Sequence, residues 1–106
     1  MILEVAIMKI KPDQVQAFEA AFPKAEAIIS SIPGYISHEM QRCVETKGKY
    51  HFLIRWENID AHMVNFRQSP KFQDFRGVLG GFFAEPPVAE HFERVTGHQL
   101  STPAGK

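Results

Sequence analysis

The sequence contains a single cysteine, Cys43, so no disulfide can form within the chain. No CxxC pair or basic helix terminus accompanies Cys43, which argues against a reactive thiolate and for a small packing residue. Long apolar runs are also missing. The first apolar stretch, 2–10, contains Glu4 and Lys9, is too short to span a bilayer and does not resemble a signal peptide. We therefore expect a protein of the reducing cytoplasm.

The chain also lacks an excess of either charge. Twelve Lys and Arg residues balance twelve Asp and Glu residues, so the formal net charge at pH 7 is zero. Nucleic-acid and anionic membrane binders usually carry a basic excess or patch. We therefore expect neither kind of partner.

Metal-binding signatures are absent from the sequence as well. The five histidines include no HxH pair, and His38 is followed by Glu39 and then by residues that break the HExxH pattern. We therefore expect no structural or catalytic metal.

Apolar and aromatic residues are abundant instead. Hydrophobic residues make up 44% of the 106 positions, and nine of them are Phe. This length suits one domain, and so large an apolar content exceeds what a simple core requires. It predicts an aromatic-rich core or apolar surface that is reserved for a partner or a ligand.

Residue periodicity predicts a strand and then a helix in the first third of the chain. Residues 2–10 alternate as a strand does, with a mixed face that includes Glu4. One apolar stripe with helical spacing follows. It consists of Val15, Phe18, Phe22, Ala25, Ile29 and Ile32. Pro23 interrupts the helix but not the phase of the stripe, so we expect one helix that is kinked near residues 21–24.

The rest of the chain predicts two strands, two short helices and a last strand. Residues 35–45 and 50–57 are strands joined by a polar hairpin turn at 46–49. Asn58 caps a helix to about residue 68, and Ser69-Pro70 begins a second one to about residue 78. Gly80-Gly81 ends that helix, and residues 88–95 form the last strand.

The resulting order, βαββαβ, predicts an α+β ferredoxin-like domain with a four-stranded antiparallel sheet. The domain spans residues 1–95, and residues 96–106 form a polar tail. Both helical regions cover one face. We expect the other face to carry mixed polar and aromatic side chains and to meet a second copy around a partly hydrated cavity. Those side chains are His38, Arg42, His51, Arg55, Trp56, His91 and Phe92.

Several stretches together resemble the antibiotic biosynthesis monooxygenase family, of the dimeric α/β-barrel superfamily. They are the strand 2–6, the helix after Lys11-Pro12, Pro33-Gly34-Tyr35 with 36–39, Trp56-Glu57 with 58–62, Ser69-Pro70 with Phe72, and 90–93. The resemblance covers about residues 2–95 and is fairly specific as a set.

The resemblance implies a homodimer with face-to-face sheets and a pocket between each sheet and its helices. Relatives oxygenate polycyclic aromatic or quinol-type substrates with molecular oxygen, without metal or flavin, so no cofactor is expected. An electron-rich phenolate can pass an electron to oxygen itself. The protein then supplies a dry aromatic pocket, a group that helps to deprotonate the phenol, and donors that hold the anion.

A second branch of the superfamily cleaves haem with an Asn on the first strand, a Trp on the second helix and a His on the helix after it. In an ungapped comparison these positions hold Val5 or Ala6, Phe66 and Arg76. The resemblance therefore disfavours haem degradation.

Two histidines are the candidate catalytic residues. His62 lies early in the second helical region, with Phe66 on the same face, and an imidazole can accept a phenolic proton near neutral pH. His91 lies on the last strand and can point into the same cavity. The structural alternatives are a hydrogen bond to a strand end for His62 and a position at the dimer seam for His91.

The candidate substrate-binding residues are aromatic or basic, because flat rings suit an aromatic substrate and a guanidinium can hold an anionic oxygen. They are His38, Trp56, Phe66, Arg67, Phe72, Phe75 and Phe83. Alternatively, the aromatic residues are core, and the arginine lies in an ion pair or in solvent.

Two hypotheses about function follow. The first is a cofactor-independent monooxygenase that acts on a small or polycyclic aromatic, phenolic or quinol substrate. The second is a dimeric module that binds a small apolar molecule without chemistry, of the kind retained for stress responses. Oxygen uptake with a hydroquinone or anthrone panel separates the two.

Overall fold

The computed structural model describes residues 1–97, and His98 with most of the predicted tail lies outside that range. The main elements are β1 (Ile2–Lys9), α1 (Val15–Ile29), β2 (Tyr35–Arg42), β3 (Lys49–Trp56), α2 (Pro70–Leu79) and β4 (Val88–Phe92). Three short helical segments join them: η1 (Pro12–Gln14), the π-helix η2 (Ala61–Phe66) and η3 (Gly80–Phe82). The βαββαβ order and the α+β ferredoxin-like fold are confirmed.

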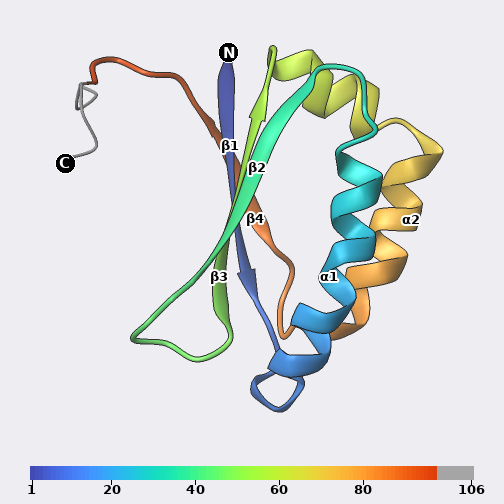
Figure 1. Cartoon of the computed structure of the whole chain (residues 1–106), viewed down its shortest axis with the longest axis vertical. Coiled ribbons are helices and arrows are strands. Elements are labelled where there is room, and N and C mark those ends of the chain that lie inside the picture. The colour runs from blue at the N-terminus through green and yellow to red at the C-terminus, as the bar shows by residue number, and fades with distance from the viewer. Residues whose placement is uncertain (98–106) are drawn as a thin grey trace, which may run out of the picture.

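The four strands form one antiparallel sheet in the order β2-β3-β1-β4. Figure 1 shows α1 and α2 side by side on one face of this sheet, and within residues 1–97 the other face carries no helix. In the register of the two central strands, Glu4 lies opposite Ile54, and on the other side of β1 it lies opposite His91. This register decides which side chains face the helices.

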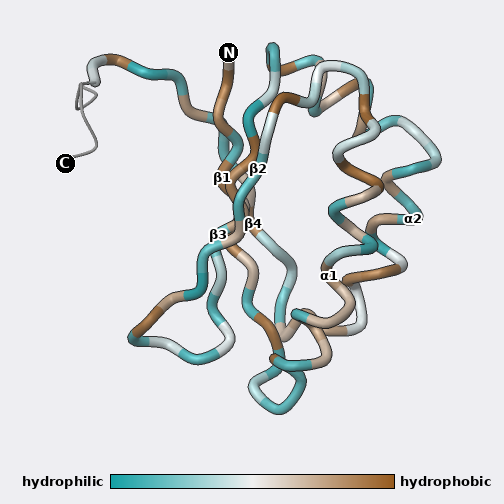
Figure 2. The backbone as a smooth tube through the Cα atoms, in the orientation of Figure 1, coloured by the Kyte–Doolittle hydropathy of each residue, from teal (hydrophilic) through white to brown (hydrophobic). Residues whose placement is uncertain are grey.

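The apolar stripe of α1 forms the core as predicted. Phe18, Phe22, Ala25 and Ile29 are buried, and hydrophobic and hydrophilic segments alternate along the helix (Figure 2). The helix runs unbroken through Pro23, which lies on its exposed side, so the prediction of one helix is confirmed. Pro12 and Asp13 lie in the separate turn η1 and not in the first turn of α1.

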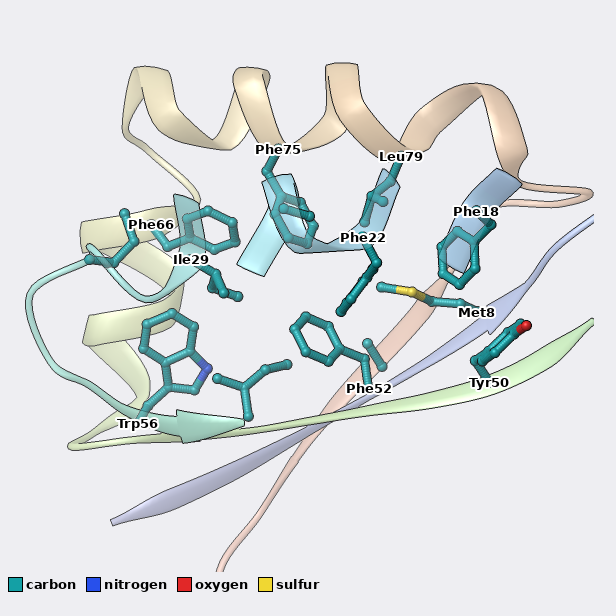
Figure 3. Packing of buried hydrophobic residues seen from close by; sticks show 14 of the residues in the cluster. Met8, Phe18, Phe22, Ile29, Tyr50, Phe52, Trp56, Phe66, Phe75 and Leu79 are labelled. Carbon is teal, nitrogen blue, oxygen red and sulfur yellow. The ribbon is translucent and has the colours of Figure 1, made fainter. Parts of the chain in front are cut away.

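Aromatic rings fill the space between the helices and the sheet (Figure 3). The largest fully buried side chains include Trp56, Tyr50, Phe18 and Phe52. Phe66 packs edge-on against Phe75, with ring centroids 5.3 Å apart. The predicted aromatic-rich core is therefore present.

The second helical region begins as the sequence predicts but adopts an unexpected geometry. The Asn58 side-chain oxygen accepts a hydrogen bond of 2.9 Å from the backbone N–H of Ala61. From Ala61 the segment is a π-helix, which the apolar spacing does not indicate. Gly34, with a φ of 93°, lies so close that a Cβ there would approach the Ala61 Cβ to 2.5 Å. The Pro33-Gly34 turn therefore packs against the start of η2.

The prediction that seven polar and aromatic side chains share the uncovered face is wrong for four of them. Since side chains alternate along a strand, the register places His38, Arg42, Trp56 and His91 on the helix-covered face. Arg42 binds Glu19 of α1 at 2.7 Å. The uncovered face keeps His51, Arg55 and Phe92 beside half-buried apolar residues, which are Leu3, Val5, Ile7 and Leu53.

Candidate functional site

A cavity of about 720 Å³ opens between the sheet, α2 and the loop that leads to β4. Its wall is mostly apolar. The strands contribute Ala6, Met8, Phe52, Ile54 and Ala89, and the helical segments and the loop contribute Ile29, Phe66, Phe72, Phe75, Leu79 and Phe83. A cavity of this size and lining suits a flat organic molecule.

Two buried polar side chains interrupt this apolar wall. Glu4 is 5% exposed and His62 is 3% exposed, and both line the cavity. Glu4 occupies an inward position of β1, and His62 projects from η2 above it. A buried carboxyl group is costly unless it is hydrogen-bonded or neutral, so its presence requires an explanation.

Close polar contacts connect these two residues with Trp56 and His91. Trp56 Nε1 donates to Glu4 Oε1 at 2.9 Å, and His62 Nε2 lies 3.4 Å from the same oxygen. On the other side of the imidazole, His62 Nδ1 and His91 Nε2 share a hydrogen bond of 2.7 Å. His91 is only half-buried and does not line the cavity, so these contacts lead from the cavity wall towards solvent.

Burial shifts both ionisable groups towards their neutral forms. It raises the pKa of Glu4 to about 7, although the Trp56 hydrogen bond and the positive charge of Arg67 act in the opposite direction. Burial, with His91 and Arg67 as smaller causes, lowers the pKa of His62 to about 4. At pH 7 the imidazole is therefore neutral and the carboxyl is half protonated. The 3.4 Å contact between them is therefore not an ion pair of two charged groups.

Two guanidinium groups lie at the edge of the cavity. The Cζ atoms of Arg67 and Arg76 lie 4.7 and 5.8 Å from the centroid of the Phe72 ring. Both arginines are exposed, and both line the cavity. They can therefore hold an anionic group of a molecule whose apolar part lies deeper.

The structure brings six of the predicted site residues to this cavity. They are His62, Phe66, Arg67, Phe72, Phe75 and Phe83. His91 and Trp56 lie directly behind the cavity wall, in contact with His62 and Glu4.

His38 lies elsewhere. Its ring bonds the Tyr35 hydroxyl at 2.5 Å and the Glu26 carboxylate at 2.6 Å, and it does not line the cavity.

Glu4 is the site residue that sequence reasoning missed. The available signal was its parity, because Glu4 shares a strand face with Ala6, Met8 and Ile10, all of which are buried. A lone acidic residue at an inward strand position indicates a special environment.

Residues 1–97 contain neither a metal-binding cluster nor a membrane-spanning helix. Within that range no cluster of three or more His, Cys, Asp or Glu side chains has an arrangement that could hold a metal ion. The helices of the same range include none with the length and hydropathy of a membrane span.

Comparison with protein families adds to this geometry. Residues 1–78 match the model of the family described as antibiotic biosynthesis monooxygenase, which is well over half of the chain. The chain belongs to the antibiotic biosynthesis monooxygenase family. The matched range includes Glu4, Trp56 and His62 and ends before Phe83 and His91.

Similar proteins agree with this assignment to the antibiotic biosynthesis monooxygenase family. The uncharacterized protein YczJ of Bacillus subtilis (strain 168) is 39% identical over 95 residues, which cover 90% of this chain and 100% of YczJ. A crystal structure of a family protein from Bordetella bronchiseptica is 35% identical, with a TM-score of 0.86 over 90% of this chain and 97% of that one. SnoaB from Streptomyces nogalater, described as a cofactor-independent oxygenase, shares the fold at 18% identity, with a TM-score of 0.75 over 91% and 94% of the chains.

Proposed function

We propose that this protein oxygenates a small or polycyclic electron-rich phenol or quinol with molecular oxygen, without metal or flavin. Membership of the family and the similarity of the fold to a cofactor-independent oxygenase support the general activity. One observation carries the proposal: the apolar cavity holds a buried acid–base pair, Glu4 and His62, beside an aromatic wall.

The proposed chemistry needs little from the protein. Anthrone serves as the model substrate, because its enol form is a phenol. Loss of the phenolic proton gives an electron-rich anion, which passes an electron to oxygen, and the radical pair then forms a C–O bond. The resulting peroxide anion takes up a proton, and its O–O bond and the C–H bond at the same carbon then break, which releases water and leaves the second carbonyl group. The balance is one anthrone and one O₂ giving one anthraquinone and one water, so the substrate supplies all the electrons.

The aromatic, basic and acid–base residues of the cavity have separate roles in this scheme. Phe66, Phe72, Phe75 and Phe83 enclose the rings, and Arg67 stabilises the phenolate oxygen. The buried acid–base pair of Glu4 and His62 takes the proton, and His91 supports His62 through their hydrogen bond. His38 has no role in this scheme because it lies outside the cavity.

We further propose that the protein is a homodimer that buries the uncovered face of the sheet. Half-buried Leu3, Val5, Ile7 and Leu53 lie on that face, and Val88 and Phe92 at its β4 edge are 60% and 49% exposed. An apolar face of this kind is typical of a surface that meets a partner.

The direct test follows oxygen uptake with a panel of hydroquinones and anthrone. We expect the wild-type rate to exceed the rate without protein, and His62→Ala to lower it about 100-fold, the low end for the loss of an acid–base group. Tight binding of a panel compound together with a rate equal to that of the blank would indicate a binding module and refute the oxygenase.

A further inference from the structure

We propose that Glu4 takes the proton of the substrate, and that His62 and His91 relay a proton from Glu4 to solvent at the β4 edge of the sheet. The inference rests on the proposed oxygenase function and assigns its proton path. It gives Glu4 the catalytic role and makes His91 a positioning and relay residue that never contacts the substrate.

The contacts of Glu4 leave one carboxyl oxygen for a substrate. Trp56 and His62 both approach Oε1, at 2.9 and 3.4 Å. Oε2 has no hydrogen-bond partner within residues 1–97. Every fully buried side-chain oxygen in that range does have one, so Oε2 is not fully buried. Since Glu4 lines the cavity, we infer that Oε2 is exposed to the cavity.

The two ring nitrogens of His62 connect Glu4 with His91. An imidazole can accept a proton at one nitrogen while it donates one from the other. His62 Nε2 faces Glu4, and His62 Nδ1 bonds His91 Nε2 at 2.7 Å. The half-buried His91 can release a proton to water without any opening of the cavity.

The transfer balances when the resting Glu4 carries its proton on Oε1. The phenolic proton moves to Oε2 as the Oε1 proton moves to His62 Nε2 and the Nδ1 proton of His62 moves to His91 Nε2. The substrate becomes a phenolate, His91 becomes an imidazolium, and Glu4 and His62 end neutral with their protons exchanged. No oxidant or reductant takes part in this step.

The charges around the chain agree with neutral relay members. Arg67 is the charged group that influences both Glu4 and His62, and burial keeps the pKa of Glu4 at about 7 and that of His62 at about 4. Near pH 6.5 Glu4 is therefore mainly a neutral carboxylic acid, and His62 is a neutral imidazole. Above pH 7 Glu4 is ionised, and its carboxylate can accept a single proton without the relay.

The first arm of the test needs no substrate. Nitrogen NMR of the histidine side chains at pH 6 should show His62 protonated at Nδ1 and unprotonated at Nε2. Replacement of His91 by Ala should shift the Nδ1 signal, whereas His38→Ala, whose ring bonds Tyr35 and Glu26 outside the cavity, should not. A proton on Nε2 of His62 would overturn the relay, whatever the activity of the protein.

The second arm measures oxygen uptake with anthrone at pH 6.5. Glu4→Gln should lower the rate about 100-fold at every pH, and His91→Ala about tenfold at pH 6.5 and less above pH 7. Added imidazole should restore His91→Ala towards the wild-type rate and leave the His38→Ala rate unchanged. An unaltered rate in Glu4→Gln, or a pH-independent loss in His91→Ala that imidazole does not rescue, would refute the relay. Absence of uptake in the wild type would refute the oxygenase itself, and the NMR arm would still judge the proton path.

Discussion

At the scale of single residues, Glu4 shows how burial in the fold changes the acid–base properties of a side chain. Its carboxyl lies among buried strand residues and satisfies one oxygen with the Trp56 N–H. Burial disfavours the charged form, and the pKa of Glu4 rises to about 7, which is a useful value for acid–base work near neutral pH.

This pKa shift makes the stability of the protein depend on pH. The pKa of Glu4 is raised from 4.5 to about 7 on folding, so the folded state binds more protons than the unfolded chain between these values. The stabilisation is complete below pH 4.5 and is lost as the pH rises to 7. Glu4→Gln has no such titration and should gain about 3 kcal/mol relative to the wild type over that range.

Urea unfolding of both proteins at pH 4.5, 6 and 8 measures this difference. His62 titrates in both proteins, with stability lost as the pH falls from 6.5 towards 4, so its contribution largely cancels. A difference between the two proteins that stays constant with pH would show that Glu4 has an ordinary pKa.

Some site residues are visible in the sequence and others are not, for a physical reason. His62 and Phe66 could be paired from their spacing because both belong to one local segment. Glu4, Trp56 and His91 come from three different strands, and their meeting depends on the strand register. Composition alone does not fix a register, and a shift of one residue moves every side chain to the opposite face. The same limitation led to the wrong placement of His38 and Arg42.

At the scale of secondary-structure elements, the turn before β2 and the segment η2 act as one unit. Gly34 has a φ of 93°, and a Cβ there would come within 2.5 Å of the Ala61 Cβ. His62 is the next residue after Ala61, so this contact also sets the height of the imidazole above the sheet. The stripe of α1 and the Asn58 cap were predictable because they are local, whereas the π-helix depends on tertiary packing.

Substitution of Gly34 by Ala should therefore destabilise the protein by at least about 1–2 kcal/mol, because the left-handed conformation and the close contact both oppose a side chain. Gly77 is the matched control. It lies inside α2, and nothing lies within 4 Å of the position that a methyl group would take there, so Gly77→Ala should stabilise by about 0.5–1 kcal/mol. Thermal unfolding of the two variants measures both effects, and equal shifts in Tm would contradict this packing.

At the scale of the whole molecule, the two faces of the sheet have different tasks. The helix-covered face holds the core, the cavity and the buried Glu4 and His62, while the uncovered face holds half-buried aliphatic side chains. Burial of that face in a dimer would stabilise the strands that carry Glu4 and His91, and therefore the site itself.

The proposed dimer predicts a clear response to a charge on this face. Leu53 lies in the middle of β3, opposite Val5, so Leu53→Asp would place a carboxylate in the dimer interface. Sedimentation at micromolar concentration should give the mass of two chains for the wild type and of one chain for the variant. Val44→Asp, at a hydrophobic residue that is 92% exposed outside the strands, should leave the dimer intact. A wild type that sediments as one chain would refute the dimer.

The most direct test of the account is the fate of labelled oxygen when the protein acts on anthrone under ¹⁸O₂. The account predicts one labelled oxygen atom in each anthraquinone formed, at a rate that exceeds the protein-free blank and falls about 100-fold in Glu4→Gln. Labelled product that forms at the blank rate, or equally fast with wild type and Glu4→Gln, would contradict the claim that the buried acid–base pair in this cavity drives the oxygenation.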